Sequence, residues 1–260
     1  MIHPIASIRA RKQNWMANHF ELTSHGRKIA AMKDRYRGRR CFLIGNGPSL
    51  RAEDLTKLKE HGEICFAFNR IYNIFENTSW RPDYYISQDE KMLAGCMEAV
   101  DRTELGVKLV PINLKWYHGI RLSSADWFFM KRPREDGGKP LQFSDDPAKC
   151  VYNASTGMYT AAQFAAYMGF SEIYLIGVDH HFRISQNNSG EIVIDDSVKD
   201  YFSEKYNEDK EKLYIPNTEK STLTYVAMKE QCEKRGMRVY NATRGGKLEV
   251  FERIDFDSLF

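Results

Sequence analysis

The sequence predicts an α/β protein whose sheet is mostly parallel and carries helices on both faces. Short apolar runs alternate along the chain with stretches of helical periodicity, and this alternation is typical of parallel sheets. The first apolar run ends in a glycine-containing turn that opens a helix. Polar residues follow the ends of several runs, at the edge where ligands collect in such sheets. Together these features indicate a Rossmann-like fold.

The first strand–turn–helix unit starts at residues 41–44, a short apolar run that suits a buried parallel strand. After the turn, leucines at helical spacing predict a helix from Leu50 to Leu58 that stops near Gly62. An apolar strand restarts at residues 64–68. Further strands are predicted at 84–87, 107–110, 172–177 and 237–240, and further helices at 156–168 and 219–235.

Two stretches interrupt the alternation of strands and helices. Residues 131–150 are rich in Pro, Gly, Asp and Lys, and this composition predicts a loop or a small insertion. Residues 180–218 are polar and acidic, and they predict a mobile lid. We therefore expect a basic helical leader at residues 1–37 and a single Rossmann-like domain at residues 38–260.

The leader is strongly basic, because residues 1–40 hold ten Lys or Arg and two acidic residues, whereas the whole chain carries only +3. The charges are spread through the segment, so we favour a solvated helix or a subunit contact. Contact with an anionic membrane surface is the alternative, because several apolar residues fall near one helical face. Nucleic-acid binding is disfavoured, since the rest of the chain is acidic and shows no zinc-finger or RNP-type signature. The apolar residues of the leader face are Ile8, Trp15, Met16 and Phe20.

The leader is expected to add few side chains to the core. No stretch approaches the roughly 18 apolar residues that span a bilayer, and the first residues lack the apolar core of a secretory signal. Scattered cysteines without a CxxC pair indicate reduced thiols. We expect a cytoplasmic protein, with contact at the inner face of the membrane through the leader as the alternative, and we leave a homo-oligomer open. The cysteines are Cys41, Cys65, Cys96, Cys150 and Cys232.

The turn after the first strand is the first candidate site. Its sequence, Gly45-Asn46-Gly47-Pro48-Ser49, places two glycines where the backbone bends and where a phosphate or ribose must approach the main chain. The helix start that follows would offer unpaired N–H groups to an anion. The spacing differs from GxGxxG and lacks the Walker lysine, so it indicates neither a dinucleotide fold nor a P-loop ATPase. An ordinary turn in which Ser49 caps the helix is the alternative.

Four further polar clusters follow predicted strands or open a predicted helix. A cap or turn role is the alternative for each cluster, but their convergence at one sheet edge favours a ligand site. Asn and Ser side chains can pair with the edge of a base and the hydroxyls of a ribose, and carboxylates and imidazoles supply titratable groups near a phosphate leaving group. The clusters are Asn69, Asp89, Ser155-Thr156-Gly157 and Asp179-His180-His181.

The two adjoining histidines would point to opposite sides of a strand, so only one of them, His181, is expected to face the site. A buried structural histidine is the alternative. With Asp179 the histidines could also ligate a metal, but the spacing places no third ligand, so we predict no protein-bound metal. A nucleotide-bound Mg²⁺ would need only one or two carboxylates.

Four motifs carry a resemblance to a known family. They are Cys41-Phe-Leu-Ile-Gly-Asn-Gly-Pro-Ser-Leu50, Phe68-Asn-Arg-Ile71, Trp80-Arg-Pro-Asp-Tyr-Tyr85 and Tyr240-Asn-Ala-Thr-Arg-Gly-Gly-Lys-Leu-Glu-Val-Phe251. In these motifs the chain resembles the 6-hydroxymethylpterin diphosphokinase MptE-like domain family. That family includes archaeal pterin diphosphokinases, domains of flagellin glycosyltransferases and bacterial proteins associated with surface polysaccharides. The chain is more distantly similar to the bacterial lipooligosaccharide sialyltransferases, which hold a CMP-sugar in a Rossmann-like fold without a metal.

The similarity to the sialyltransferases implies roles for single residues. It implies that Asp89 faces the transferred sugar and that His181, beside Asp179, takes the place of a phosphate-binding tyrosine, so these three are the implied catalytic residues. The chain has Asn153 where those enzymes have an arginine, and Asn217 where their general-base histidine falls. Because Asn cannot act as that base, the similarity implies nucleotide binding rather than the same catalytic mechanism. The implied nucleotide-binding residues are Gly45, Asn46, Gly47, Ser49, Asn69, Ser155, Thr156 and Gly157.

Residues 38–260 are therefore expected to be a nucleotide-binding transferase domain with a lid at about 180–218. We favour a glycosyltransferase that passes a sugar of the CMP-nonulosonate type to a glycan or lipid-linked acceptor in cell-surface glycan assembly, with no cofactor. The alternative is an MptE-like diphosphokinase that moves diphosphate from ATP to a hydroxymethyl pterin, with Mg²⁺ held by Asp89 and Asp179. A non-catalytic nucleotide-binding domain is the second alternative, because the histidine base is missing.

Overall fold

The computed structural model describes residues 4–133, 141–207 and 213–260. Its centre is an eight-stranded sheet, and every pair of neighbouring strands in it is parallel. The predicted mostly parallel α/β fold is therefore confirmed. The strands of this sheet are β1 (Arg40–Ile44), β2 (Ile64–Phe68), β3 (Tyr84–Ile86), β4 (Val107–Pro111), β5 (Asp126–Phe128), β8 (Glu172–Ile176), β11 (Arg238–Asn241) and β12 (Glu252–Arg253).

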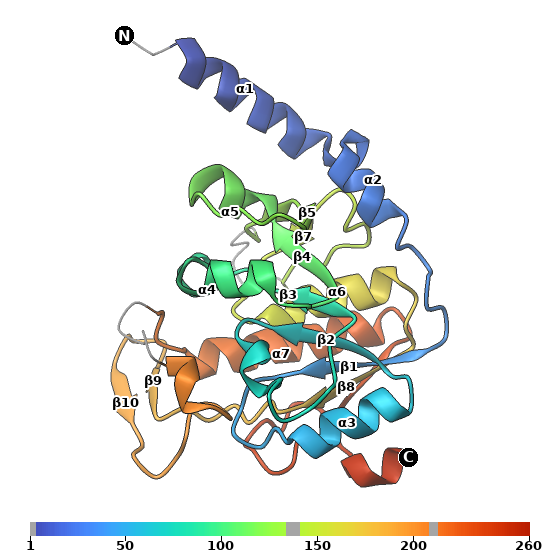
Figure 1. Ribbon diagram of the computed structural model, residues 1–260, viewed down its shortest axis with the longest axis vertical. Helices are drawn as coiled ribbons and strands as arrows, with labels where there is room; N and C mark the ends of the chain where they lie inside the picture. The colour runs from blue at the N-terminus through green and yellow to red at the C-terminus, as the bar shows by residue number, and fades with distance from the viewer. Residues whose placement is uncertain (1–3, 134–140, 208–212) are drawn as a thin grey trace.

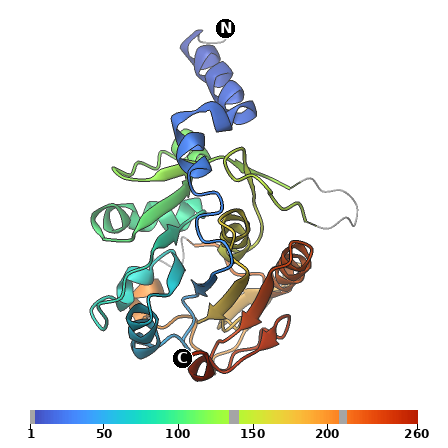
Figure 2. The same cartoon turned by 90° about the vertical axis from the view of Figure 1, so that its right-hand side faces the viewer.

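Helices cover both faces of the sheet, as the three layers in Figure 2 show. Alternate side chains of β1 point to opposite faces of the sheet. Leu43 belongs to the core layer that includes residues of the helices at 157–167 and 218–233. Phe42 belongs to the other layer, which includes residues of the helices at 52–60, 90–102 and 112–117. The helices are α1 (Pro4–Asn18), α2 (Ser24–Ala30), α3 (Ala52–Glu60), α4 (Glu90–Arg102), α5 (Ile112–Tyr117), α6 (Gly157–Tyr167) and α7 (Thr218–Glu233). The 3-10 helices are η1 (Phe20–Leu22), η2 (Ile71–Ile74), η3 (Glu204–Asn207) and η5 (Phe256–Leu259).

The strand order is β12-β11-β8-β1-β2-β3-β4-β5, and it reverses beside β1. The chain runs outward from β1 to β5 and then returns through α6 to β8, which pairs with the other side of β1. The loops that follow β1 and β8 therefore leave the sheet toward opposite layers. This reversal opens a crevice at the carboxyl ends of the two strands, which is the usual place for a ligand in an open α/β sheet.

The second half of the basic leader belongs to the body of the protein. Phe20 and Ile29 are fully buried, Met32 is nearly so, and α2 packs against the edge strand β5. Lys28 adds an ion pair to Asp126 of β5, with 2.9 Å between Nζ and Oδ1. The prediction that the leader adds little to the core is therefore wrong for residues 20–32, because they cover an edge strand that the sequence did not predict. Helix α1 projects away from the body (Figure 1).

The two predicted interruptions differ in structure. The described part of the 131–150 loop follows β6 (Met130–Lys131) and precedes β7 (Val151–Tyr152), which pairs with β6 in parallel; residues 134–140 lie outside the described residues. The 180–218 region contains a hairpin of β9 (Ile184–Gln186) and β10 (Ile192–Ile194); residues 208–212 lie outside the described residues. Within the described ranges, no helix is long and apolar enough to span a bilayer.

Candidate functional site

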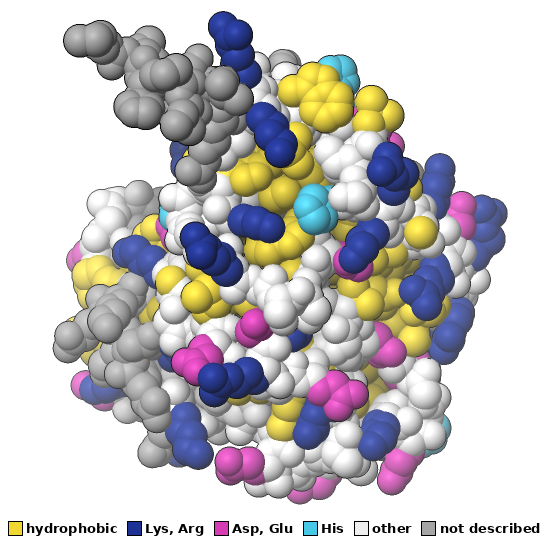
Figure 3. All heavy atoms as spheres, turned by 45° about the horizontal axis from the view of Figure 1, so that its top comes forward, with side chains coloured by type: hydrophobic (Ala, Val, Ile, Leu, Met, Phe, Trp, Pro, Cys, Tyr) yellow, Lys and Arg dark blue, Asp and Glu magenta, His cyan; other side chains and the backbone are white. Residues whose placement is uncertain are grey.

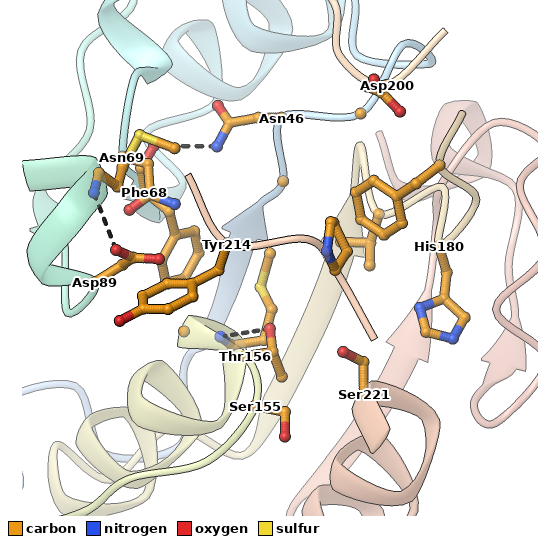
Figure 4. Close-up of a pocket in the computed structure, with 18 of the residues that line it drawn as sticks. Asn46, Phe68, Asn69, Asp89, Ser155, Thr156, His180, Asp200, Tyr214 and Ser221 are labelled. Atoms are coloured by element: carbon orange, nitrogen blue, oxygen red, sulfur yellow. Dashed lines mark hydrogen bonds between the residues drawn. The ribbon is translucent and has the colours of Figure 1, made fainter. Parts of the chain in front are cut away.

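A pocket of about 560 Å³ opens at the carboxyl ends of the central strands, and its volume is that of a small-molecule site. The turn after β1, the starts of α4 and α6, the loop after β8 and the 180–218 region all contribute to it (Figure 4). Of the residues predicted from the sequence, only Ser49 does not line it. Those that do are Gly45, Asn46, Gly47, Asn69, Asp89, Ser155, Thr156, Gly157, Asp179 and His181.

The first turn needs glycines because the loop after β8 lies too close to it for a side chain. A Cβ atom on Gly45 would lie 2.2 Å from the carbonyl oxygen of Gly177, and one on Gly47 would lie 1.9 Å from Oδ2 of Asp179. The N–H groups of Gly45 and Gly47 already donate to the carbonyls of Ile176 and Gly177. The N–H groups of these two glycines are therefore used within the protein and are not available to a ligand.

Ser49 joins the same two loops and does not cap the helix. Arg51 is the N-cap of α3. The hydroxyl of Ser49 donates to Oδ2 of Asp179 over 2.7 Å, and this bond ties the β1 turn to the β8 loop. The helix start that does line the pocket is that of α6, where Thr156 is the N-cap and accepts from the N–H of Met158. The partial positive charge of that helix end is available to an anion.

Asn46 lines the pocket and carries a buried acceptor. Its Nδ2 donates to the carbonyl of Phe68 over 3.1 Å, which fixes the amide (Figure 4). Its Oδ1 is buried and has no hydrogen-bond partner among the described residues. A buried acceptor without a partner costs about 1–3 kcal/mol, so a ligand that donates to it would gain affinity. The amino group of a base and a ribose hydroxyl are donors of this kind.

Asn69 and Gly157 shape the pocket beside Asn46. Asn69 adopts a left-handed backbone (φ 51°), which asparagine tolerates better than most residues, and its Oδ1 accepts from the hydroxyl of Ser87. A Cβ on Gly157 would lie 3.0 Å from the ring of Phe68, so glycine lets the start of α6 approach that ring. These two residues therefore position the wall of the pocket, while Ser155 is exposed at its rim.

Two predicted carboxylates lie in the pocket, and burial raises the pKa of each. Asp89 is the N-cap of α4, and its Oδ1 accepts from the N–H groups of Lys91 and Met92. Asp179 accepts from Ser49 as described above, which partly offsets the effect of burial on its pKa. Both carboxyl groups are therefore held in fixed orientations, and both keep a proton to higher pH than exposed aspartates do.

Both histidines line the pocket, so the prediction that only one faces it is wrong. They lie in the loop after β8, and His180 adopts a left-handed backbone (φ 53°), which removes the alternation that a strand would impose. His180 places Nε2 2.7 Å from the hydroxyl of Thr222, and burial lowers its pKa. His181 places Nε2 2.9 Å from Oδ2 of Asp195 in the 180–218 region.

Several lining residues were not predicted from the sequence. Gln88 donates to Oδ1 of Asn153 over 3.1 Å and accepts from the hydroxyl of Thr160 over 2.6 Å. Its place directly after β3 and before Asp89 was the available signal. Tyr214 donates its hydroxyl to Oε1 of Glu90 over 2.6 Å, so the 180–218 region contacts α4 across the pocket.

The charged residues that line the pocket are mostly acidic. The lining includes four carboxylates, one lysine and no arginine among the described residues, together with the two histidines. No group of three or more His, Cys, Asp or Glu side chains in the described ranges could hold a metal ion. Asn217, where the similar sialyltransferases have a base, caps α7 by accepting from the N–H of Lys220 over 2.8 Å. The carboxylates are Asp89, Glu90, Asp179 and Asp200, and the lysine is Lys220.

Comparison with known proteins places the chain in a family. Its structure is similar to the MAf glycosyltransferase from Magnetospirillum magneticum AMB-1, with 14% identity and a TM-score of 0.47 over 91% of this chain and 38% of that one. The chain thus spans well under half the length of that protein. No protein of curated function matches the sequence. Residues 13–185 match the family described as 6-hydroxymethylpterin diphosphokinase MptE-like, and because this match covers more than half of the chain, the chain belongs to that family.

Proposed function

We propose that the chain is a nucleotide-dependent transferase, and specifically a glycosyltransferase that uses a nucleotide-activated sugar in cell-surface glycan assembly. The observation that carries this proposal is the buried, unpartnered Oδ1 of Asn46, a residue that lines the pocket together with the start of α6. The amide suits a nucleoside, and the helix end suits a phosphate. Membership of the MptE-like family supports the transferase class.

The charge of the pocket favours a donor with few phosphates. Lys220 is the only lysine among the described lining residues, and four carboxylates oppose it. A triphosphate would meet strong repulsion there unless a cation accompanied it. A monophosphate donor such as a CMP-nonulosonate carries less charge, so the start of α6, Lys220 and the two histidines suffice for it.

The proposed reaction uses Asp89 and His181. The acceptor hydroxyl attacks the anomeric carbon of the donor sugar and forms the new glycosidic bond, while the bond from that carbon to the phosphate oxygen breaks. Asp89 takes the hydroxyl proton, which a carboxylate with a raised pKa does better than an ordinary one. His181, oriented by Asp195, donates an N–H to the phosphate oxygen that leaves. Asp179 ties the loop that carries His181 to the β1 turn that carries Asn46.

The diphosphokinase reaction is the second candidate, and the carboxylate-rich lining favours it. Asp89 and Asp179 could share a Mg²⁺ ion that a nucleotide carries into the pocket, since Mg²⁺ needs only one or two protein carboxylates. That ion would neutralise the phosphates of ATP. A nucleotide-binding domain without turnover is the third candidate, because Asn217 replaces the histidine base.

A thermal-shift screen separates these candidates. The full chain is heated with CMP, CDP, UDP, GDP and ATP, each with and without Mg²⁺, because a ligand raises the melting temperature according to its occupancy. We expect CMP to stabilise the protein without Mg²⁺. Stabilisation by ATP alone, and only with Mg²⁺, would favour the diphosphokinase, and no shift with any nucleotide would contradict both enzymes.

A further inference from the structure

A second hollow shares no lining residue with the pocket at the carboxyl ends of the central strands. It is a groove of about 910 Å³ between the leader helices and the segment that begins with α5. On the face shown in Figure 3, hydrophobic side chains gather in a hollow and basic side chains surround them. We call this feature the leader groove, and its lining residues include Lys12, Met16, His25, Lys115, Trp116 and Arg121.

The leader groove is positively charged. It is lined by Lys12, Lys115 and Arg121, and no Asp or Glu is among its described lining residues. Burial lowers the pKa of His25, and the nearby charges of Lys115 and Lys28 lower it further. Lys28 is paired with Asp126, whereas Lys115 has no ion pair to a carboxylate among the described residues. The groove therefore holds positive charge that the protein itself does not neutralise.

The floor and rim of the leader groove are apolar and aromatic. Met16, Trp116 and Leu122 line it, and Tyr117 at its rim has 64% of its surface exposed. Trp15, which directly precedes Met16 in α1, is 52% exposed. Aromatic rings with a polar edge, next to lysine and arginine, are typical of surfaces that lie at the boundary between lipid headgroups and acyl chains.

We propose that the leader groove binds anionic phospholipid headgroups and so seats the protein on a membrane surface. The phosphates of the lipids meet Lys12, Lys115 and Arg121, while Tyr117 and Trp116 lie among the glycerol and upper acyl groups. Each basic residue near an anionic bilayer strengthens binding several-fold. This inference does not depend on which nucleotide or sugar the other pocket takes.

Two other occupants fit the leader groove less well. A second copy of the chain in a two-fold dimer would place the same surface against itself, and the three basic residues would then face like charges without a carboxylate. The basic residues could contact the phosphates of a nucleic acid, but its polar backbone would not bury the aliphatic side chains of Met16 and Leu122. A bilayer surface offers phosphates to the basic residues and acyl groups to the apolar side chains of the leader groove.

Vesicle co-sedimentation of the full chain tests the proposal. Wild-type protein is mixed at low salt with vesicles of phosphatidylcholine alone, and with vesicles in which about one third is phosphatidylglycerol. The test variant is the double charge reversal Lys115→Glu and Arg121→Glu. The control is Arg51→Glu with Lys234→Glu, which changes the net charge equally at two exposed residues outside the groove. Tyr117→Ser is a third variant that leaves all charges in place.

We expect wild type and the control to bind only the anionic vesicles, and the groove double variant to lose about a hundredfold in partition. Tyr117→Ser should bind several-fold more weakly at raised salt, where the apolar contribution remains. The proposal is overturned if wild type ignores anionic vesicles, or if groove and control variants lose binding equally. It is also overturned if the groove variants change the oligomeric state in sedimentation equilibrium, or if they weaken binding to single-stranded RNA and leave vesicle binding intact.

Discussion

Single side chains of the pocket were predictable where they directly follow a strand, and unpredictable where their partners are distant in sequence. Asn46 and Asp89 each follow an apolar run closely, so the sequence placed them at the right edge. Ser49 resembles a helix cap in the sequence, but its partner Asp179 lies 130 residues away, and only the fold brings them together. The sequence predicted that His180 points away from the site, as it would on a strand. His180 itself adopts a left-handed backbone, so the alternation of the preceding strand does not continue through it.

We expect the pH dependence of turnover to report the protonation of Asp89, the proposed general base. Burial raises its pKa above the ordinary value of 3.8, and a general base must be deprotonated to act. Turnover should therefore fall as the pH drops toward that raised pKa, at a pH above 3.8, while circular dichroism still reports folded protein. Asp89→Asn should lower kcat by about a hundredfold or more, and its residual rate should lack this acid limb in the pH–rate profile. The same limb in the variant would assign the titration to another group.

Substitution of His181 is expected to lower turnover, whereas substitution of His180 is expected to lower stability. His181→Ala should lower kcat about a hundredfold with little change in nucleotide affinity, since a hydrogen bond to the leaving phosphate strengthens mainly in the transition state. His180→Ala removes the contact with Thr222 and an edge-on contact with Tyr225, so it should mainly lower the melting temperature. Turnover per folded molecule is measured for both variants. Near-normal turnover in folded His181→Ala would exclude the leaving-group role.

Whole elements were predicted where they are long or strongly apolar. The apolar runs that became β1, β2 and β8 are five residues each, and all but the first residue of β1 and β8 are buried. The three-residue edge strand β5 was missed because Asp126-Trp127-Phe128 gives no periodic signal. The β9–β10 hairpin was missed because its surroundings are polar and β10 is exposed along its length. The sequence therefore predicted the central strands of the sheet better than its edge strand and the peripheral hairpin.

The mobility of the 180–218 region remains a prediction, and amide hydrogen exchange tests it. Strand β10 is exposed, whereas β1 is buried at four of its five positions. Amides of residues 184–207 should therefore exchange much faster than those of β1 in the free protein. Nucleotide binding should slow that exchange, because Tyr201 and Tyr214 line the same pocket. Equal exchange in the two segments, or no change on ligand binding, would show that this region is not a lid.

At the scale of the whole molecule, the reversal of strand order places the site. The sequence could predict a parallel sheet from alternating elements, but not that β8 would pair beside β1, because pairing between distant strands leaves no local pattern. The leader shows the same limit. Its basic composition suggested a separate arm, whereas the three apolar residues Phe20, Ile29 and Met32 join it to the core.

Two truncations should therefore differ in stability. Removing residues 1–18 takes away α1, which projects from the body, and should change the free energy of unfolding little. Removing residues 1–32 also takes away Phe20, Ile29 and Met32, and the loss of buried large side chains costs about 2–5 kcal/mol each. Urea unfolding of both proteins measures the difference. Equal stability of the two truncated proteins would show that residues 19–32 do not contribute to the folded core.

Calorimetric titration of Asn46→Ala tests the central claim most directly, because that claim places a nucleotide against the buried Oδ1 of Asn46. The nucleotide that stabilises the protein most in the thermal screen is titrated into wild type, Asn46→Ala and the control Asn14→Ala, whose asparagine is exposed on α1. Asn46→Ala should weaken binding by about 1–3 kcal/mol, which is roughly five- to more than a hundredfold in Kd, and the control should bind as wild type does. Unchanged affinity in a folded Asn46→Ala protein would remove the nucleotide from this pocket.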